Sequence, residues 1–223
     1  MAQSASAAGG ADEVQRLMRR LLADKSAHRT FVAPLVAGVH LGGGGGGAGA
    51  GRDLVACCEH WGVRIGTAFQ VLDDLSDLAA DPLASGKDGL QDLREGRLSV
   101  PLFLLRERAT EAEWAEVLAL LSGHRQLGAP GRRFILDLVQ HHALVDVGLD
   151  IVDTEIRAAD AVLSDQLSPE EPFFLSPGSA VLGLGLGRFT DGLRAHAEQV
   201  RAEIAESGLL RDDAGEEAFD VCT

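Results

Sequence analysis

The chain has 223 residues, a formal net charge of −14 at pH 7, no tyrosine and only 4% aromatic residues. This length fits one domain with a sizeable core, and the composition favours helices over strands, which are usually richer in aromatic and β-branched residues. The acidic balance disfavours generic binding to nucleic acid or anionic lipid, because both need clustered lysine and arginine. We therefore expect a single all-α domain.

Targeting and membrane-spanning segments are not expected. Residues 1–11 are small and polar, without a basic segment followed by an apolar one, and predict a disordered N-terminus rather than a secretory signal. The apolar stretch SAVLGLGLGRF is too short and too rich in glycine to span a bilayer. Cys57, Cys58 and Cys222 are odd in number and lack metal-like spacing, so reduced thiols and a cytoplasmic location are expected.

Hydrophobic periodicity predicts one helical domain over 12–206, ahead of an acidic tail over 207–223. The first predicted helix runs from Asp12 to about Leu41, unless Pro34 opens a new helix at its first turn. Further helices, bounded by glycine and proline, are expected over 52–80, 98–108, 111–122, 130–146, 148–165 and 188–206.

A glycine-rich run over 42–51 separates the first two predicted helices. It matches G-x-G-x-x-G trivially, but no strand precedes it and no GK[ST] follows, so we interpret it as a flexible linker rather than a phosphate-binding loop. In the helix after it, Ile65, Phe69, Leu72 and Ser76 recur at three and four residues and predict the buried face.

Three aspartates, Asp73, Asp74 and Asp77, crowd one turn of the helix predicted over 52–80. Spacings of three and four residues direct their carboxylates toward a shared face, with Gln70 one turn earlier. A solvated acidic helix face is one interpretation. A calcium-binding EF-hand loop is not, because leucine occupies the third and sixth positions of its frame. A magnesium site is the other, because Mg2+ binds one or two carboxylates together with water and phosphate oxygens.

Two basic residues follow the aspartates in the sequence. Lys87 and Arg97 flank a glycine-containing loop, where each can meet phosphate oxygens that a magnesium ion leaves uncovered. Taken singly, each is an ordinary surface charge. Together with the aspartates they indicate a diphosphate ligand.

The stretch GTAFQVLDDLSDLAADPLASGKDGLQDLREGRLSVPL, residues 66–102, resembles the second aspartate-rich region of trans-isoprenyl diphosphate synthases. The family pattern G-x-x-FQ-x-x-DD-x-x-D is followed by GK and DL-x-E-G-K-x-TLP, and this chain has FQ, DDxxD, GK, DLREG and Pro101 in that order. Arg97 and Ser99 stand where the family has lysine and threonine. The resemblance implies an all-α isoprenoid-synthase helical bundle, of which the chain holds the C-terminal half.

The resemblance also implies a set of functional residues. Magnesium would be held by the carboxylates of Asp73, Asp74 and Asp77. The residues that would contact the diphosphate or face the pocket are Lys25, Gln70, Lys87 and Arg97. Lys25, with Ser26 after it, stands where the family has a Lys-Thr pair. The implied reaction is a magnesium-assisted ionisation of an allylic diphosphate, followed by attack of the double bond of isopentenyl diphosphate.

Residues 1–68 contain neither an earlier DDxxD nor the basic region that binds isopentenyl diphosphate in the family. We therefore hypothesise one subunit of a split, heteromeric prenyltransferase, inactive without a second polypeptide that carries the first DDxxD. Apolar faces left uncovered by the missing helices are a further reason to expect that partner. A non-catalytic regulatory subunit of a prenyl diphosphate synthase and part of a class I terpene cyclase, whose pocket uses aromatic rings, are the alternatives.

The remaining candidate residues are interpreted as structural. His141 and His142 are adjacent and would point about 100° apart on a helix, which predicts solvated histidines rather than shared metal ligands. Cys57 and Cys58 are interpreted as packing residues. The GLGLGRF segment, Gly183 to Phe189, is interpreted as a place where helices could pack closely.

Overall fold

Every element in the described part of the chain is a helix, which confirms the predicted all-α class. The computed structural model describes residues 20, 23–42, 50–79, 99–122, 128–166 and 177–210. The helices in chain order are η1 (Ala23–Val32), α2 (Ala33–Leu41), α3 (Ala50–Ala79), α6 (Val100–Arg108), α7 (Glu111–Leu121), α8 (Ala129–His141), α9 (Leu144–Gln166) and α10 (Pro177–Glu206). Most of the glycine-rich run and the predicted tail lie outside the described residues.

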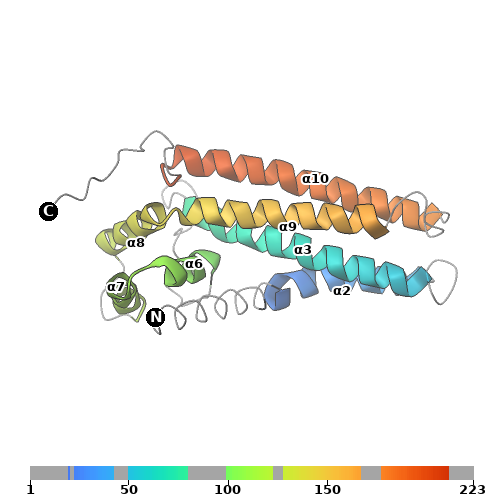
Figure 1. The fold of residues 1–223 in the computed structure, drawn as a ribbon, viewed down its shortest axis with the longest axis horizontal. Helices are drawn as coiled ribbons and strands as arrows, with labels where there is room; N and C mark the ends of the chain where they lie inside the picture. Colours follow the sequence, from blue (N-terminus) through green and yellow to red (C-terminus); the bar gives the residue numbers. More distant parts are fainter. Residues whose placement is uncertain are drawn as a thin grey trace, which may run out of the picture.

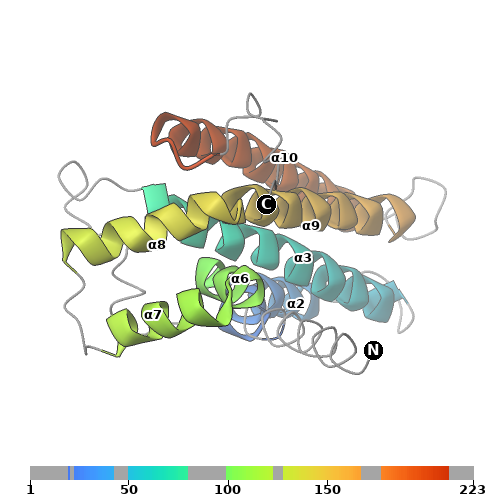
Figure 2. The ribbon, with the colours of Figure 1, turned by 60° about the vertical axis from the view of Figure 1, so that its left-hand side comes forward.

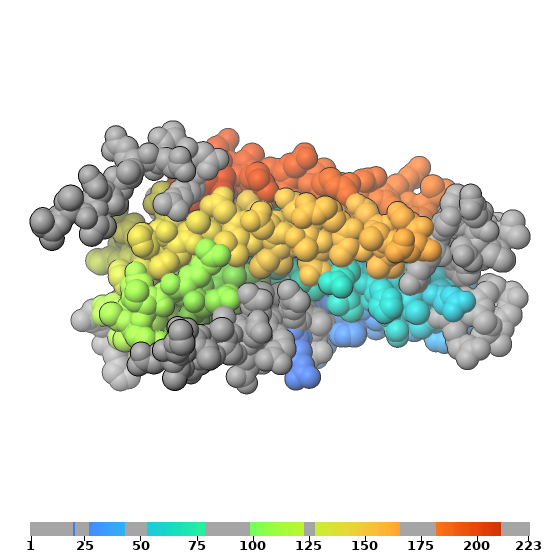
Figure 3. Space-filling model, in the orientation of Figure 1, coloured from blue at the N-terminus to red at the C-terminus, as the bar shows by residue number. Residues whose placement is uncertain are grey.

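Three long helices, α3, α9 and α10, lie side by side along the length of the molecule, and α9 packs against both of the others (Figures 1 and 2). The segment η1 and helix α2 pack against α3, while α6, α7 and α8 gather at one end (Figure 1). On the face shown in Figure 3, α9 crosses the middle of the molecule beneath α10. None of the described helices has both the length and the apolar character needed to cross a membrane.

The core lies along α3, whose apolar residues recur at four and three positions and so share one face. The residues that follow this spacing, all of them buried, are Trp61, Ile65, Ala68, Leu72 and Leu75. Ile65 and Leu72 were predicted on this face, but Phe69 was wrongly placed there, because its side chain is 38% exposed. Ser76 is half-buried. The true stripe runs through Ala68 instead of Phe69.

Polar contacts join the three long helices where the core ends. The indole Nε1 of Trp61 donates to Thr190 Oγ1 over 3.2 Å, inside the contact between α3 and α10. Arg64 on α3 and Glu155 on α9 form an ion pair of 3.0 Å. A buried indole N–H needs such an acceptor, so Thr190 fixes α10 relative to α3.

Prolines begin several of the helices. Pro34 lies in the first turn of α2, as one of the two predicted alternatives required, and prolines also lie in the first turns of α6 and α8. Pro177 begins α10, eleven residues before the predicted start at residue 188. Proline fits a first helical turn because its missing N–H would have no partner there.

Glycine was a poorer guide to the boundaries. Gly148 was predicted to separate two helices but lies inside α9, where a Cβ would come within 2.9 Å of Leu75 Cδ1. The glycine there allows α9 to approach α3 closely. Gly185 and Gly187 were predicted to allow close helix packing, but a Cβ at either position would meet nothing within 4 Å. They do not mark the close packing predicted for Gly183 to Phe189.

Cys57 and Cys58 are buried free thiols, as predicted for packing residues. Burial raises the pKa of the Cys57 thiol to about 11, with a further contribution from the neighbouring Cys58. Burial likewise raises the pKa of Cys58 to about 11, with a smaller effect from Glu59. Since the thiolate is the reactive form, both side chains are poor nucleophiles and poor metal ligands in the folded protein.

Substituting alanine at Gly66 is expected to destabilise the fold. A Cβ there would lie 2.4 Å from Ala27 Cα and 2.6 Å from Ala27 Cβ, so η1 would have to move. Overpacking should exceed the gain in helix propensity and lower the free energy of unfolding by about 1–2 kcal/mol. Gly192→Ala is the matched control, because a Cβ at Gly192 meets nothing within 4 Å. It should stabilise by about 0.5–1 kcal/mol. Urea denaturation measures the free energy of unfolding of both variants. Equal changes in the two variants would contradict the close contact between Gly66 and Ala27.

Candidate functional site

The three aspartates lie near the C-terminal end of α3 in three different environments. Asp73 is exposed, Asp77 is half-buried, and Asp74 is buried. The prediction that all three project toward one shared face is therefore incomplete, since Asp74 points into the protein. Asp73 and Asp77, four residues apart, lie one turn from each other on the more open side of the helix.

Asp74 joins α3 to the beginning of α6. Its Oδ1 accepts a hydrogen bond of 2.7 Å from Gln70 Nε2, and its Oδ2 accepts one of 2.7 Å from the backbone N–H of Val100. Val100 is the first residue of α6, and the side chain of Ser99 before it makes no capping bond. A carboxylate is well suited to this position, because the free N–H groups of a helix N-terminus carry a partial positive charge.

This contact brings the two ends of the family-like stretch together. Gln70 and Asp74 come from its first part and Val100 from its last, and all three are now joined by hydrogen bonds. The sequence interpretation placed Gln70 in the pocket, whereas in the structure its amide binds Asp74 and its side chain is buried. Lys87 and Arg97 lie outside the described residues.

Lys25 lies on η1, which packs against α3 just before the aspartates. Ala27 faces Gly66, and Val32 faces Gly62, so η1 and α3 run in opposite directions along their contact. The start of η1 is therefore nearer than its end to the aspartate end of α3. The side chain of Lys25 is outside the described part of the structure.

Aromatic rings cluster beside Gln70. Phe69 lies 5.7 Å from Phe31 on η1, and Phe31 lies 5.6 Å from Phe189 on α10, measured between ring centroids. The ring of Phe189 also lies 5.9 Å from that of Trp61. Because Phe69 and Phe189 are 38% and 43% exposed, the cluster presents apolar surface that begins one turn before Asp73, at Phe69, and extends toward Trp61.

One group of potential metal ligands was not anticipated. Glu113, His141 and His142 place their ligand atoms within 4.8 Å of one another. His141 is exposed, as predicted, but His142 is half-buried, and the two rings lie 4.8 Å apart, measured between centroids, rather than diverging. The capping sequence T-x-x-E of Thr110 and Glu113 was visible in the chain, but nothing in it indicated a contact with a histidine 29 positions away.

Comparison with known proteins gives three results. A family model for polyprenyl synthetase matches residues 10–128. A short chain isoprenyl diphosphate synthase of Methanothermobacter thermautotrophicus is 33% identical over 106 residues, 47% of this chain and 31% of that protein. The chain thus matches about a third of that relative's length. The crystal structure of a polyprenyl synthase from Roseobacter denitrificans aligns with a TM-score of 0.54 and 20% identity, covering 89% of this chain and 60% of that one. This likeness shows an isoprenoid-synthase fold.

The buried and exposed aspartates should respond differently to truncation. Asp74→Ala leaves the N–H of Val100 and the amide of Gln70 without their acceptor, and we expect it to lower the free energy of unfolding by about 2–3 kcal/mol. Asp73→Ala, at an exposed position on the same helix, should change it by less than about 0.5 kcal/mol. Urea denaturation without magnesium measures both, and an equally stable Asp74→Ala variant would refute the linking role of that carboxylate.

Proposed function

The chain belongs to the polyprenyl synthetase family, and from this premise we propose that it is one subunit of a split prenyltransferase. The reaction condenses an allylic diphosphate with isopentenyl diphosphate and lengthens the chain by one five-carbon unit. This chain contributes the second aspartate-rich site, which binds the allylic diphosphate through Mg2+. A second polypeptide contributes the first DDxxD.

The observation that carries the proposal is the arrangement around Asp74. Asp73 and Asp77 are solvent-accessible to different degrees and one turn apart, and Asp74 between them anchors the beginning of α6. Arg97 is three residues before Val100, a separation that a fully extended chain spans with about 11 Å. The Asp74–Val100 hydrogen bond therefore favours a guanidinium within reach of a diphosphate bound at the aspartates.

The residues fit magnesium, since the donors are carboxylate oxygens and Mg2+ prefers oxygen ligands. Asp73, Asp74 and Asp77 form the proposed set. Both oxygens of Asp74 accept hydrogen bonds, from Gln70 and from the backbone of Val100, so within this set the more accessible Asp73 and Asp77 would make the first contacts with the ion. When bound, the ion neutralises the charge that develops on the departing diphosphate.

The side chains of this chain supply the rest of the proposed site. Lys25, Lys87 and Arg97 hold phosphate oxygens and stabilise the leaving group as the allylic C–O bond breaks. Gln70 fixes the carboxylate of Asp74 through its amide, and so supports the metal site as a positioning residue. The ring of Phe69 lies one helical turn before Asp73, and the rings of Phe31 and Phe189 continue from it toward Trp61; this apolar row would suit the hydrocarbon tail of an allylic substrate.

Binding of magnesium diphosphate can be tested on the chain alone. Mg2+ and inorganic diphosphate together should raise the melting temperature of the wild-type protein, because a ligand of the folded state stabilises it. Asp73→Asn should abolish the rise. The matched control is Asp53→Asn, which removes an exposed aspartate from the other end of α3 and should leave the rise unchanged. No shift in the wild-type protein would oppose the metal site and favour the regulatory-subunit alternative.

The partner is tested separately, by co-purification of the tagged chain from its host. We expect a second chain with an early DDxxD at comparable abundance, and prenyl transfer by the reconstituted pair. In that pair Asp73→Asn should lower kcat by about 100-fold or more, since it removes stabilisation of the leaving group. A chain recovered only with copies of itself would contradict the split enzyme. Release of a hydrocarbon rather than a linear diphosphate would instead identify a terpene cyclase.

A further inference from the structure

Glu113, His141 and His142 meet where α7 lies against the turn between α8 and α9, away from the aspartates of α3. Each side chain offers one ligand atom, and these atoms lie within 4.8 Å of one another. Among the described residues no other three histidine, cysteine, aspartate or glutamate side chains do so. None of the three takes part in the function proposed above, so the two inferences can fail independently.

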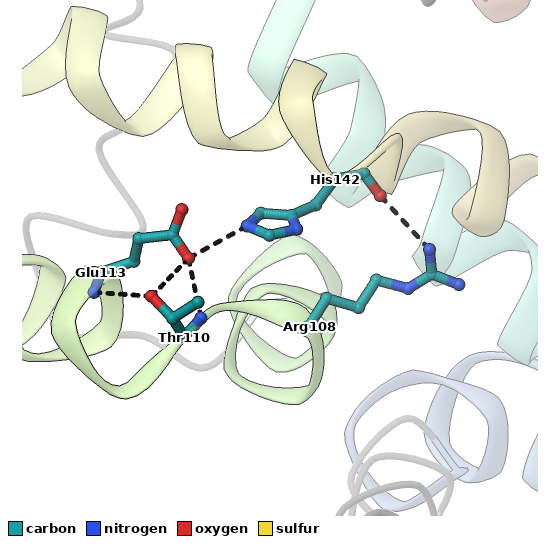
Figure 4. Close-up of polar contacts among 4 residues, drawn as sticks. All are labelled: Arg108, Thr110, Glu113 and His142. Atoms are coloured by element: carbon teal, nitrogen blue, oxygen red, sulfur yellow. Dashed lines mark hydrogen bonds and ion pairs between the residues drawn. The ribbon is translucent and has the colours of Figure 1, made fainter. Parts of the chain in front are cut away.

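The two histidines lie at the junction between the end of α8 and the turn that leads to α9. The helix ends at His141, and Ala143 two residues later adopts a left-handed conformation with a φ of 50°. This conformation is unfavourable for alanine, so the surrounding contacts must hold the turn in place. Arg108 does so by donating a 3.3 Å hydrogen bond to the carbonyl of His142. Figure 4 shows the guanidinium on one side of His142 and the imidazole directed to the other, toward Glu113.

Glu113 is held from its other side by the capping box of α7. Its Oε2 accepts hydrogen bonds from the backbone N–H and the hydroxyl of Thr110, at 2.7 and 2.8 Å (Figure 4). The backbone bond, followed by the hydroxyl bond, lowers the pKa of the Glu113 carboxyl below its ordinary value. The group is therefore a carboxylate at neutral pH. Outer-shell hydrogen bonds of this kind orient metal-binding carboxylates.

The distances suit a small metal ion. His142 Nε2 lies 3.3 Å from Glu113 Oε2. Two ligands of a tetrahedral zinc ion, each about 2.0–2.1 Å from the metal, are about 3.3 Å apart. Because Oε2 already accepts two hydrogen bonds from Thr110, the other oxygen of the same carboxylate, Oε1, would be the metal ligand. His141 is exposed, so rotation of its ring can bring the third ligand atom closer. Its ring already lies 4.8 Å from that of His142, measured between centroids.

We propose that Glu113, His141 and His142 form a binding site for a divalent transition-metal ion, of which zinc is the best match. Two imidazole nitrogens and one carboxylate are a ligand set typical of zinc, with a fourth position left for water. Mg2+ fits poorly, because it prefers oxygen ligands. A bound ion would strengthen the connection of α7 to the turn between α8 and α9, which His142 and Glu113 already join, while Arg108 at the end of α6 holds the same turn.

Titration of the full chain with Zn2+ tests the site, after removal of any histidine tag and in the absence of magnesium and diphosphate. We expect saturable binding of one ion at micromolar concentration and a higher melting temperature. His141→Ala and Glu113→Gln should each weaken binding at least about tenfold. Glutamine at position 113 keeps an acceptor for Thr110, so the cap of α7 is preserved. The matched control, His196→Ala, removes an exposed histidine from α10 and should bind as the wild type does.

Cobalt provides a second readout that does not depend on stability. Co2+ at the proposed site should give the visible absorption of a four-coordinate ion without thiolate charge-transfer bands, which would mark binding by cysteine instead. Absence of Zn2+ binding at micromolar concentration would overturn the proposal. So would equal affinity in the wild type, His141→Ala and Glu113→Gln, because the ion would then lie elsewhere and the contact of His142 with Glu113 would be an ordinary hydrogen bond.

Discussion

The hydrogen bond from the Val100 N–H to Asp74 fixes the arrangement of α3 and α6 around the three aspartates. It joins the C-terminal part of α3 to the beginning of α6 through a buried carboxylate rather than through an apolar contact. Helix α6 also packs against α9, so the hydrogen bond to Asp74 helps to hold α6 against the central helices of the bundle. The three aspartates therefore differ in environment: the carboxylate of Asp74 is buried and binds the backbone of Val100, whereas Asp73 is exposed and Asp77 is half-buried.

The neighbouring residues of the motif divide in the same way. Gln70 turns inward and binds Asp74, whereas Phe69 turns outward and contacts the ring of Phe31. Adjacent residues on a helix point about 100° apart, so one turn of α3 can serve a polar network and an apolar surface together. The buried ring of Phe31 on η1 connects Phe69 to the exposed ring of Phe189 on α10.

Much of the fold was predictable because its signals are local. The apolar spacing of α3 and the prolines at helix starts are visible within a few residues, and both predict helices that the structure contains. Gly148 was misread because its reason is distant: it faces Leu75 on another helix. The early end of α8 was missed for a different reason, since Ala143 takes a left-handed conformation that sequence patterns associate with glycine.

The site was predictable only in part for the same physical reason. Spacing along a helix places Asp73, Asp74 and Asp77 on one turn, but it does not reveal that a backbone N–H 26 residues later would draw Asp74 inward. The group of Glu113, His141 and His142 was missed altogether, because it needs a turn conformation and a contact between separate helices. The assignments of Lys25, Lys87 and Arg97 stay predictions.

The close contact between η1 and α3 limits the size of the side chains that α3 can carry at Gly62 and Gly66. Gly62 and Gly66 are four residues apart, so together they leave a groove on α3 without side chains, and Val32 and Ala27 lie along it. No larger residue fits at Gly66 without separating the helices. Gly66 begins the stretch, residues 66–102, that resembles the second aspartate-rich region of the family. Invariance of this glycine among related proteins would therefore be explained by steric selection on packing, and would not by itself count as evidence that the position contacts substrate.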